Sequence, residues 1–405
     1  MRVPSVYTQR KKQGAILLVL TGCVLLWVAS FYASSLDATE TIELADDCPP
    51  YFRLNQQNIC KLNSLYDLYP AVNPQWGGYR VALPDRRDGF TPQQIDLGRY
   101  LFFDSILSVD RDLSCAHCHH PDFSMSDGRA RSSGRHGSGV GPARTDGAEL
   151  PRAAPTLWNM AFQQQFFWDG RAPTLEDQII TVLTTRDEMG WSPEQLVETL
   201  NDIPAYRQLF LQAFGVNSIK FEQVLVAIVA FETSLVSLHS RYDQYIHGAQ
   251  DALTGQEING LHIFRSFASR CSQCHTPPLF TSGQLVTTGV PAMKGTPFDV
   301  GAEAVTSEPS LRGAFKVPTL RNIARSGPYM HAGQSETLVD AISFYNDVPG
   351  HAVQERDDLT LHWHVVDPDL RSDEIADLMA FLNALTDETA LPAPPERLPS
   401  GLPVP

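Results

Sequence analysis

Apolar residues recur at helical spacing along much of this chain, and long alternation of apolar and polar residues is absent. The clearest helical pattern lies in the segment 221–235, whose apolar positions are Phe221, Leu225, Ile228, Phe231 and Leu235. Spacings of three and four residues place these side chains on one face of a helix, so the segment is predicted to be a core helix. The pattern as a whole predicts a mainly α-helical protein with many loops.

Several segments begin with the signals of a helix N-terminus. Thr91 is followed by proline at the first helical position and by glutamine three residues after the cap, which is a capping box. Ser192 opens a similar pattern, and Ser372 is expected to cap the last helix. The segment 254–259 (TGQEIN) repeats 91–96 (TPQQID), and each copy runs into a phenylalanine and then into a CxxCH motif. The repeat predicts a duplicated structural unit.

The two CxxCH motifs are CAHCH at 115–119 and CSQCH at 271–275. CxxCH is the attachment signal of c-type haem, because two thiols one turn apart can each add to a haem vinyl group while the histidine supplies an axial nitrogen. Zinc knuckles also use CxxC pairs, but two pairs in separate halves of the chain, each followed by histidine, favour two haems. The predicted attachment residues are Cys115, Cys118, Cys271 and Cys274, with His119 and His275 as proximal iron ligands.

The N-terminal region predicts export from the cytoplasm. Residues 14–33 carry no formal charge and follow the basic residues 10–12, which predicts an inner-membrane anchor with the rest of the chain in the periplasm. A cleaved signal peptide and a lipoprotein cleaved before Cys23 remain alternatives, and both also export the chain. In an oxidising compartment Cys48 and Cys60 are expected to form a disulfide.

Length and charge set the domain organisation and exclude one class of partner. With 405 residues and 43% hydrophobic content, the chain can bury two cores. A net charge of −15 argues against nucleic acid as a partner. The predicted regions are an anchor or signal at 1–35, an irregular extension at 36–88, a first haem domain at 89–250, a second haem domain at 251–386 and a disordered Pro-rich tail at 387–405.

Several motifs around the haem signals resemble the bacterial di-haem cytochrome c peroxidase and MauG family. They are FWDGRA at 167–172, LEDQ at 175–178, DEM at 187–189, VPTLRN at 317–322 and PYMH at 328–331. The resemblance covers about residues 90 to 386 in the right order. It implies two mainly α-helical cytochrome c-like domains whose haems lie near a shared interface, the first reacting with hydrogen peroxide and the second passing electrons.

The resemblance also implies roles for individual residues. Trp168 corresponds to the indole between the two haems, and Gln178 and Glu188 correspond to polar residues of the peroxide pocket. A carboxylate over an open iron can take a proton from one peroxide oxygen and return it to the leaving one. Tyr345 occupies the position where cytochrome-dependent peroxidases usually have a methionine ligand and MauG has tyrosine. A phenolate stabilises ferric and higher states, so Tyr345 on the second iron favours a MauG-like subtype, with Met330 as the alternative ligand.

Three positions depart from the family pattern. His136 follows Arg135, which stands where many of these peroxidases carry a removable histidine ligand; His136 is either that ligand or a mobile surface residue, and we favour an open first iron. Ala153 replaces an asparagine that helps to bind calcium in the family, which argues against a calcium ion held in that way. Val182 replaces a proline of MauG-like pockets, so the pocket shape need not transfer.

Four other histidines give weaker signals. His117 and His120 flank the first motif and are predicted to be surface residues. His362 and His364 alternate around Trp363, but two histidines without a third partner are a weak indication of a metal site.

The sequence therefore predicts a periplasmic, membrane-tethered di-haem oxidoreductase that reacts with hydrogen peroxide. Its electrons would come from a protein donor, either a small cytochrome or a side chain of a protein substrate, and Tyr345 favours the second. The alternative is a non-catalytic di-haem electron-transfer cytochrome, which predicts six-coordinate iron at both sites and no use for Glu188.

Overall fold

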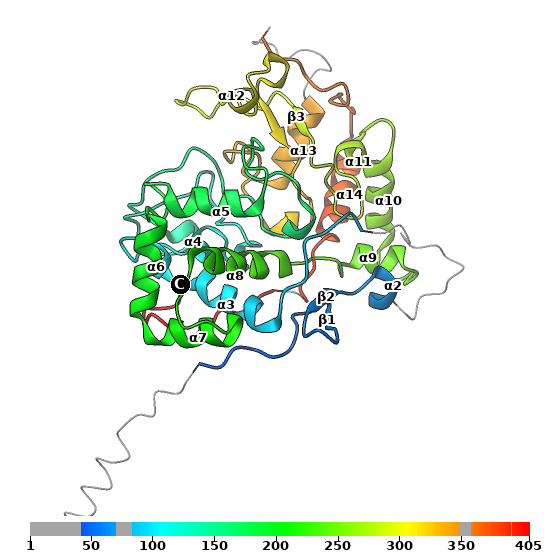
Figure 1. The fold of residues 1–405 in the computed structure, drawn as a ribbon. Helices are drawn as coiled ribbons and strands as arrows, with labels where there is room; N and C mark the ends of the chain where they lie inside the picture. The colour runs from blue at the N-terminus through cyan, green and yellow to red at the C-terminus, as the bar shows by residue number, and fades with distance from the viewer. Residues whose placement is uncertain (1–41, 70–82, 348–357, 390) are drawn as a thin grey trace, which may run out of the picture. The chain divides into compact units, whose positions relative to one another are not determined.

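Two crossing helix pairs form the framework of the protein in the computed structural model, which describes residues 42–69, 83–347, 358–389 and 391–405. Helix α3 (Pro92–Phe103) packs against α8 (Phe221–Ser234), and α10 (Gly255–Arg265) packs against α14 (Ser372–Asn383) (Figure 1). All four segments belong to one compact unit, Leu44–Pro405. The core helix predicted at 221–235 is confirmed to within one residue at its end.

The remaining elements are short and are joined by long loops, as the mainly helical pattern predicts. The other α-helices are α2 (Leu65–Leu68), α4 (Cys115–Cys118), α5 (Leu175–Thr184), α6 (Pro193–Asp202), α7 (Pro204–Phe214), α9 (Arg241–Ile246), α11 (Cys271–Cys274), α12 (Glu303–Thr306) and α13 (Leu338–Asp347). The strands form two antiparallel pairs, β1 (Phe52–Leu54) with β2 (Cys60–Leu62) and β3 (Leu285–Thr287) with β4 (Ala314–Lys316). The 3₁₀ helices are η2 (Ser105–Leu107), η3 (Pro121–Phe123), η4 (Gly141–Ala143), η5 (Met160–Phe162), η6 (Pro309–Leu311) and η7 (Ile323–Arg325).

In each helix pair, a glycine of one helix lies in direct contact with the backbone of the other. A Cβ atom added to Gly98 would lie 1.9 Å from the Ala227 carbonyl oxygen, and one added to Gly260 would lie 2.0 Å from the Asp377 carbonyl oxygen. In both pairs the next neighbour is the Cβ of a phenylalanine four residues further along the partner helix. This matched contact supports the predicted duplication, while the domain boundaries at 89, 250 and 386 stay a prediction.

Adding a methyl group at either glycine is expected to destabilise the fold. Gly98→Ala and Gly260→Ala should each lower the free energy of unfolding by about 2–3 kcal/mol, because backbone atoms cannot move aside as a flexible side chain can. The measurement is chemical denaturation followed by circular dichroism. Gly255→Ala is the matched control in α10, since nothing lies within 4 Å of an added Cβ there. Equal stability of all three variants would contradict the close packing.

Most of the predicted helix starts are confirmed. Thr91 and Thr254 both form the capping box, and the Ser192 hydroxyl accepts the Gln195 backbone N–H. The predicted cap at Ser372 is wrong: Arg371 is the N-cap, and Ser372 is the first helical residue. The cause is the Glu374 carboxylate, which accepts the Arg371 backbone N–H at 3.0 Å and so fixes the start one residue earlier.

The N-terminal extension is more regular than the sequence predicts. The disulfide between Cys48 and Cys60 is confirmed, and residues 52–62 form the β1–β2 hairpin rather than an irregular segment. Cys60 is buried against Ile95 of α3 and Ala230 of α8, so the hairpin is attached to the first helix pair. The predicted membrane segment at 14–33 lies outside the described residues, and no helix among those described is long and apolar enough to cross a membrane.

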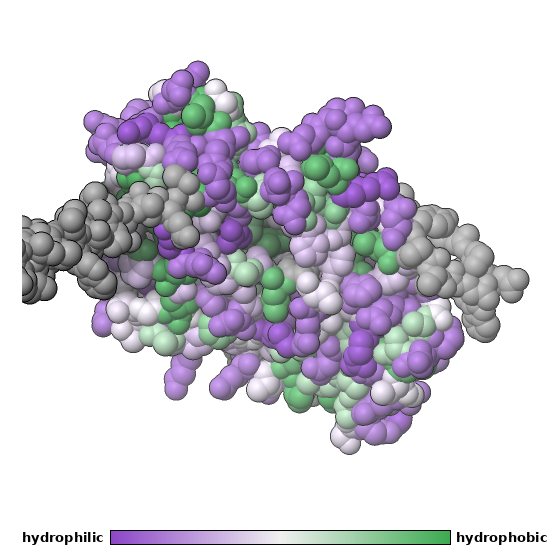
Figure 2. Space-filling view, turned by 90° about the horizontal axis from the view of Figure 1, so that it is seen from below, coloured by the Kyte–Doolittle hydropathy of each residue, from purple (hydrophilic) through white to green (hydrophobic). Residues whose placement is uncertain are grey.

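The C-terminal tail is not disordered as predicted. Leu398 is buried, and the Ser400 hydroxyl donates to the Asp104 carboxylate at 2.7 Å just after α3. The Arg99 guanidinium also donates to the Ala393 carbonyl. These contacts with α3 order a segment that forms no helix or strand of its own. On the face drawn in Figure 2, hydrophilic residues predominate and apolar ones are scattered among them, as is usual for a protein surface.

Candidate functional site: two adjoining cavities

Each CxxCH motif forms one short helix on the wall of a cavity. Helix α4 brings Cys115 and Cys118 to a cavity of about 580 Å³, and α11 brings Cys271 and Cys274 to a second cavity of about 260 Å³. Both cavities are mostly apolar, as sites for an organic cofactor are. Lys316 and Trp168 are among the residues that line both, so the two cavities share a wall.

The two motif histidines are oriented as ligands of a metal in these cavities. The His119 Nδ1–H donates to the Met125 carbonyl oxygen at 3.0 Å, and the His275 Nδ1–H donates to the carbonyl oxygens of Phe280 and Pro318 at 3.2 and 3.1 Å. A hydrogen bond at Nδ1 fixes the ring and leaves the Nε2 lone pair for a metal. Burial lowers the pKa of both histidines to about 4, so both rings are neutral at pH 7. Paired thiols, a neutral imidazole and an apolar cavity fit a haem at each site.

Glu188 provides an acid in the first cavity. It follows α5 in a turn where its backbone N–H donates to the Thr185 carbonyl, and its Oε2 is buried without a hydrogen-bond partner among the described residues. Burial raises the pKa of the Glu188 carboxyl to about 7, although the nearby Arg171 guanidinium lowers it. Gln178, from the middle of α5, lines the same cavity. The structure thus brings together the two polar residues that the sequence singled out.

Trp168 lies in the wall between the cavities. Its indole Nε1–H donates to the Ala153 carbonyl at 2.9 Å, and its own carbonyl accepts the Lys316 backbone N–H at 2.7 Å. Bonds on both sides hold the indole in a fixed orientation. Ala153, the residue in place of the family's calcium-binding asparagine, therefore supports Trp168 through its backbone.

The second cavity contains both residues proposed as its second axial ligand. Tyr345, from α13, and Met330 both line it. Burial, together with the nearby Cys274 and Cys271 thiols, raises the pKa of the Tyr345 phenol to about 12, although a hydrogen bond with Thr288 lowers it. Tyr345 and the two cysteines of the second CxxCH motif thus line the same cavity.

His136 and the residues flanking the first motif lie away from iron-ligand positions. The His136 side chain is 68% exposed, with Nδ1 3.5 Å from Asp110, and it lines neither cavity. The prediction that His117 and His120 are surface residues is wrong for His117, which is buried, with its Nδ1 accepting the Ser114 backbone N–H at the start of α4. His120 is partly exposed, and its Nδ1 accepts the Asp122 backbone N–H.

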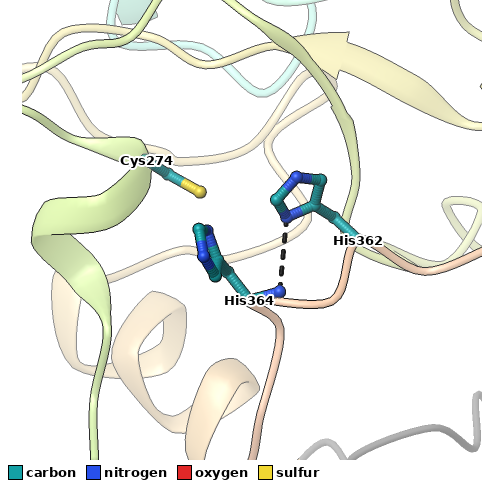
Figure 3. A group of neighbouring side chains, drawn as sticks. All are labelled: Cys274, His362 and His364. Atoms are coloured by element: carbon teal, nitrogen blue, oxygen red, sulfur yellow. Dashed lines mark hydrogen bonds between the residues drawn. The ribbon is translucent and has the colours of Figure 1, made fainter. Parts of the chain in front are cut away.

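His362 and His364 do find a third donor, which is Cys274. The donor atoms of all three lie within 4.8 Å of one another, and Figure 3 shows both rings and the thiol converging, with the His362 ring accepting the His364 backbone N–H. Cys274 is also half of the second CxxCH pair. The Cys274 sulfur cannot be both a thiolate ligand of a metal beside His362 and His364 and a thioether bonded to a haem. The three residues therefore do not make an independent metal site.

Glu232 was missed from the sequence. It is buried in α8 and lines the first cavity, with Oε2 unpartnered among the described residues. Burial raises the pKa of this carboxyl to about 8, so it is protonated at pH 7. The signal was available, because Glu232 lies four residues after Ile228 and three before Leu235, within the apolar face predicted to be core.

Comparisons with known proteins agree with the two haem sites. The model of the di-haem cytochrome c peroxidase family matches residues 92–251. The methylamine utilization protein MauG of Methylophilus methylotrophus is 33% identical over 296 residues, which are 73% of this chain and 83% of that protein. The cytochrome c551 peroxidase of Nitrosomonas europaea is 31% identical over 303 residues, 74% of this chain and 82% of that protein. A crystal structure of a MauG-like protein associated with microbial copper homeostasis superposes with a TM-score of 0.67 at 30% identity, covering 77% of this chain and 95% of that one.

These relatives confirm the family predicted from the sequence motifs and favour an enzyme over a non-catalytic electron carrier. Their similarity extends over most of both chains. The chain therefore belongs to the di-haem cytochrome c peroxidase family and is a haem-containing, peroxidase-type oxidoreductase.

Proposed function

We propose that the protein reduces hydrogen peroxide at the first cavity and draws the electrons, through the second, from a protein donor. One haem would be attached to Cys115 and Cys118 with His119 as ligand, and the other to Cys271 and Cys274 with His275 as ligand. The observation that carries the proposal is the Glu188 carboxyl, buried without a partner in the cavity that the first CxxCH motif lines. When bound, the haems supply the redox chemistry of a two-electron peroxide reduction.

The protein residues of the first cavity would transfer the protons and orient the peroxide. Reduction of hydrogen peroxide to two waters consumes two protons and two electrons, and the O–O bond breaks as the leaving oxygen is protonated. With a pKa near 7, Glu188 can accept a proton from one peroxide oxygen and return it to the other without a large energetic penalty in either direction. The Gln178 amide would orient the peroxide by hydrogen bonding. His136, exposed and paired with Asp110, would leave the first iron open.

The test of this function is the EPR spectrum of the purified holoenzyme before and after one equivalent of peroxide. We expect a high-spin ferric signal from the first haem, lost within the mixing time when peroxide is added. Two low-spin signals that peroxide leaves unchanged would overturn the proposal, because both irons would then be closed by protein ligands.

Tyr345 would hold the iron of the second haem together with His275, since both residues line the second cavity. Tyr345→Met is expected to raise the midpoint potential of the second haem, because a thioether stabilises ferrous iron relative to a phenolate oxygen. The measurement is a spectroelectrochemical titration of both haems. Met330→Leu is the control and should leave the potential unchanged. A shift in Met330→Leu without a shift in Tyr345→Met would assign the ligand to Met330 instead.

The nature of the donor follows from the Tyr345 assignment, whereas the location rests on the N-terminal sequence. With an oxygen ligand, the second haem would accept electrons poorly from a small cytochrome, which favours a side chain of a protein substrate as the donor, as in a MauG-like reaction. The protein would act in the periplasm, tethered by residues 14–33. Separating membrane and soluble fractions of cells that express the full chain tests the tether, and recovery of all the protein in the soluble periplasm would contradict it.

A further inference from the structure

Lys316 is a cation in the wall between the two cavities, and it has no carboxylate partner among the residues that the structure describes. It ends β4, and its side chain lines both cavities. Its ammonium group donates to the Gln163 side-chain oxygen and, at 3.1 Å, to the Gln165 carbonyl oxygen, both of which are neutral. In the part of the chain that the structure describes, Lys316 forms no ion pair with any aspartate or glutamate. Among the described residues, the recorded contacts of its ammonium are therefore with neutral groups, these oxygens and the Phe166 ring 5.9 Å away.

Two other cations at the first cavity are neutralised by the protein itself, whereas Arg270, at the second, donates to the carbonyl oxygens of Phe267 and Trp363. The Arg152 guanidinium donates to Asp169 at 2.6 Å and to Asp299 at 2.7 and 2.9 Å. Arg171 also donates to Asp169, at 2.9 Å. Lys316 differs from both, since burial alone lowers the pKa of its ammonium to about 8. A buried charge is costly unless an opposite charge compensates for it.

We propose that Lys316 is the counter-ion of a haem carboxylate: its ammonium group binds a propionate side chain of a haem at the wall shared by the two cavities. A haem carries two propionates, which are the only anionic groups on its periphery, and they must find partners when the cofactor is enclosed. The inference rests on the presence of the haems, and not on where peroxide reacts. It also connects the cofactor to Trp168, because the Lys316 backbone N–H donates to the Trp168 carbonyl.

The charge of Lys316 should then influence the redox potential of the haem whose propionate it binds. A positive charge close to a haem stabilises the reduced iron, which carries one positive charge fewer than the oxidised iron. Lys316→Met removes the charge and keeps an unbranched apolar side chain of similar length. We expect its haem content to stay normal and the midpoint potential of at least one haem to fall.

The experiment is a redox titration of the purified holoenzyme, combined with resonance Raman spectroscopy of the propionate bending bands. Lys316→Arg keeps the charge and should retain a potential close to that of the wild type. Lys294→Gln removes an exposed positive charge from a residue that lines neither cavity, and should shift neither the potential nor the bands. Lys316→Met should shift both.

Three results would overturn the inference. Potentials and propionate bands that are unchanged in Lys316→Met would show that no propionate depends on the ammonium. Equal shifts in Lys316→Met and Lys316→Arg would show that packing, rather than charge, sets the potential. If Lys316→Met fails to fold, Lys316→Gln replaces it, and wild-type propionate bands in Lys316→Gln would equally show that no propionate depends on the ammonium. Failure of the peroxidase function appears separately, in the reaction with peroxide, because the potentials are measured without it.

Discussion

Replacing Glu188 by glutamine is expected to slow the reaction with hydrogen peroxide by a factor of about 10²–10⁴ at pH 7, the usual loss when a general acid–base catalyst is removed. Glutamine has nearly the same shape and still fills the turn after α5, but it cannot accept and return a proton. Haem content, optical spectrum and unfolding midpoint should match those of the wild type. The measurement is the stopped-flow rate of peroxide-dependent spectral change.

The pH dependence of the same rate provides a second test of Glu188. Burial raises the pKa of this carboxyl to about 7, so the carboxylate, the form that accepts the peroxide proton, increases as the pH rises from 6 to 8. The wild-type rate should rise across that interval, and the Glu188→Gln rate should not. Glu194→Gln removes an exposed acid from the first turn of α6 and serves as the control. A Glu188→Gln variant with the wild-type rate and pH profile would assign the proton transfer to another group.

The sequence was sufficient wherever the structure depends on neighbours within a few residues. The capping boxes at Thr91 and Thr254 bond a side chain to a backbone group three residues away, and each CxxCH motif forms a single helical turn. These local signals predicted the two haem sites, and the structure gives each motif a cavity. The failure at Ser372 was also local. Glu374, three residues after Arg371, accepts the Arg371 backbone N–H, and this makes Arg371 rather than Ser372 the N-cap.

The features that sequence reasoning missed depend on contacts between distant segments. The C-terminal tail is ordered because Ser400 finds Asp104, almost 300 residues earlier in the chain. Glu232 and Lys316 look ordinary in the sequence, and only the cavities they line show that one is a buried acid and the other a cation without a carboxylate partner. Periodicity reports which face of a helix is buried, but not which cavity that face adjoins.

Replacing Arg321 by methionine is expected to cost about 3–5 kcal/mol of folding stability, because it leaves the buried Asp243 carboxylate without its partner. The Arg321 guanidinium is fully buried and forms a two-pronged ion pair with Asp243 in α9. Burial opposes the charge of Arg321, but the Asp243 carboxylate outweighs this effect and raises the pKa of the guanidinium. Chemical denaturation of the holoenzyme measures the loss. Arg371→Met is the control, since that side chain is 68% exposed and water screens its ion pairs, so stability should hardly change.

The double variant Arg321→Met/Asp243→Asn separates the charge from the packing. It removes both charges but keeps an amide oxygen that can cap α9, so it should be more stable than Arg321→Met alone. If it is no more stable, the loss belongs to the other bonds of Arg321, chiefly the one that its Nε–H donates to the Pro278 carbonyl at 2.9 Å. That bond joins 317–322 to 278–280, the two segments whose carbonyls accept the His275 Nδ1–H. Loss of Arg321 should therefore also broaden the optical bands of the second haem before the protein unfolds, whereas a purely structural ion pair far from the site would leave them unchanged.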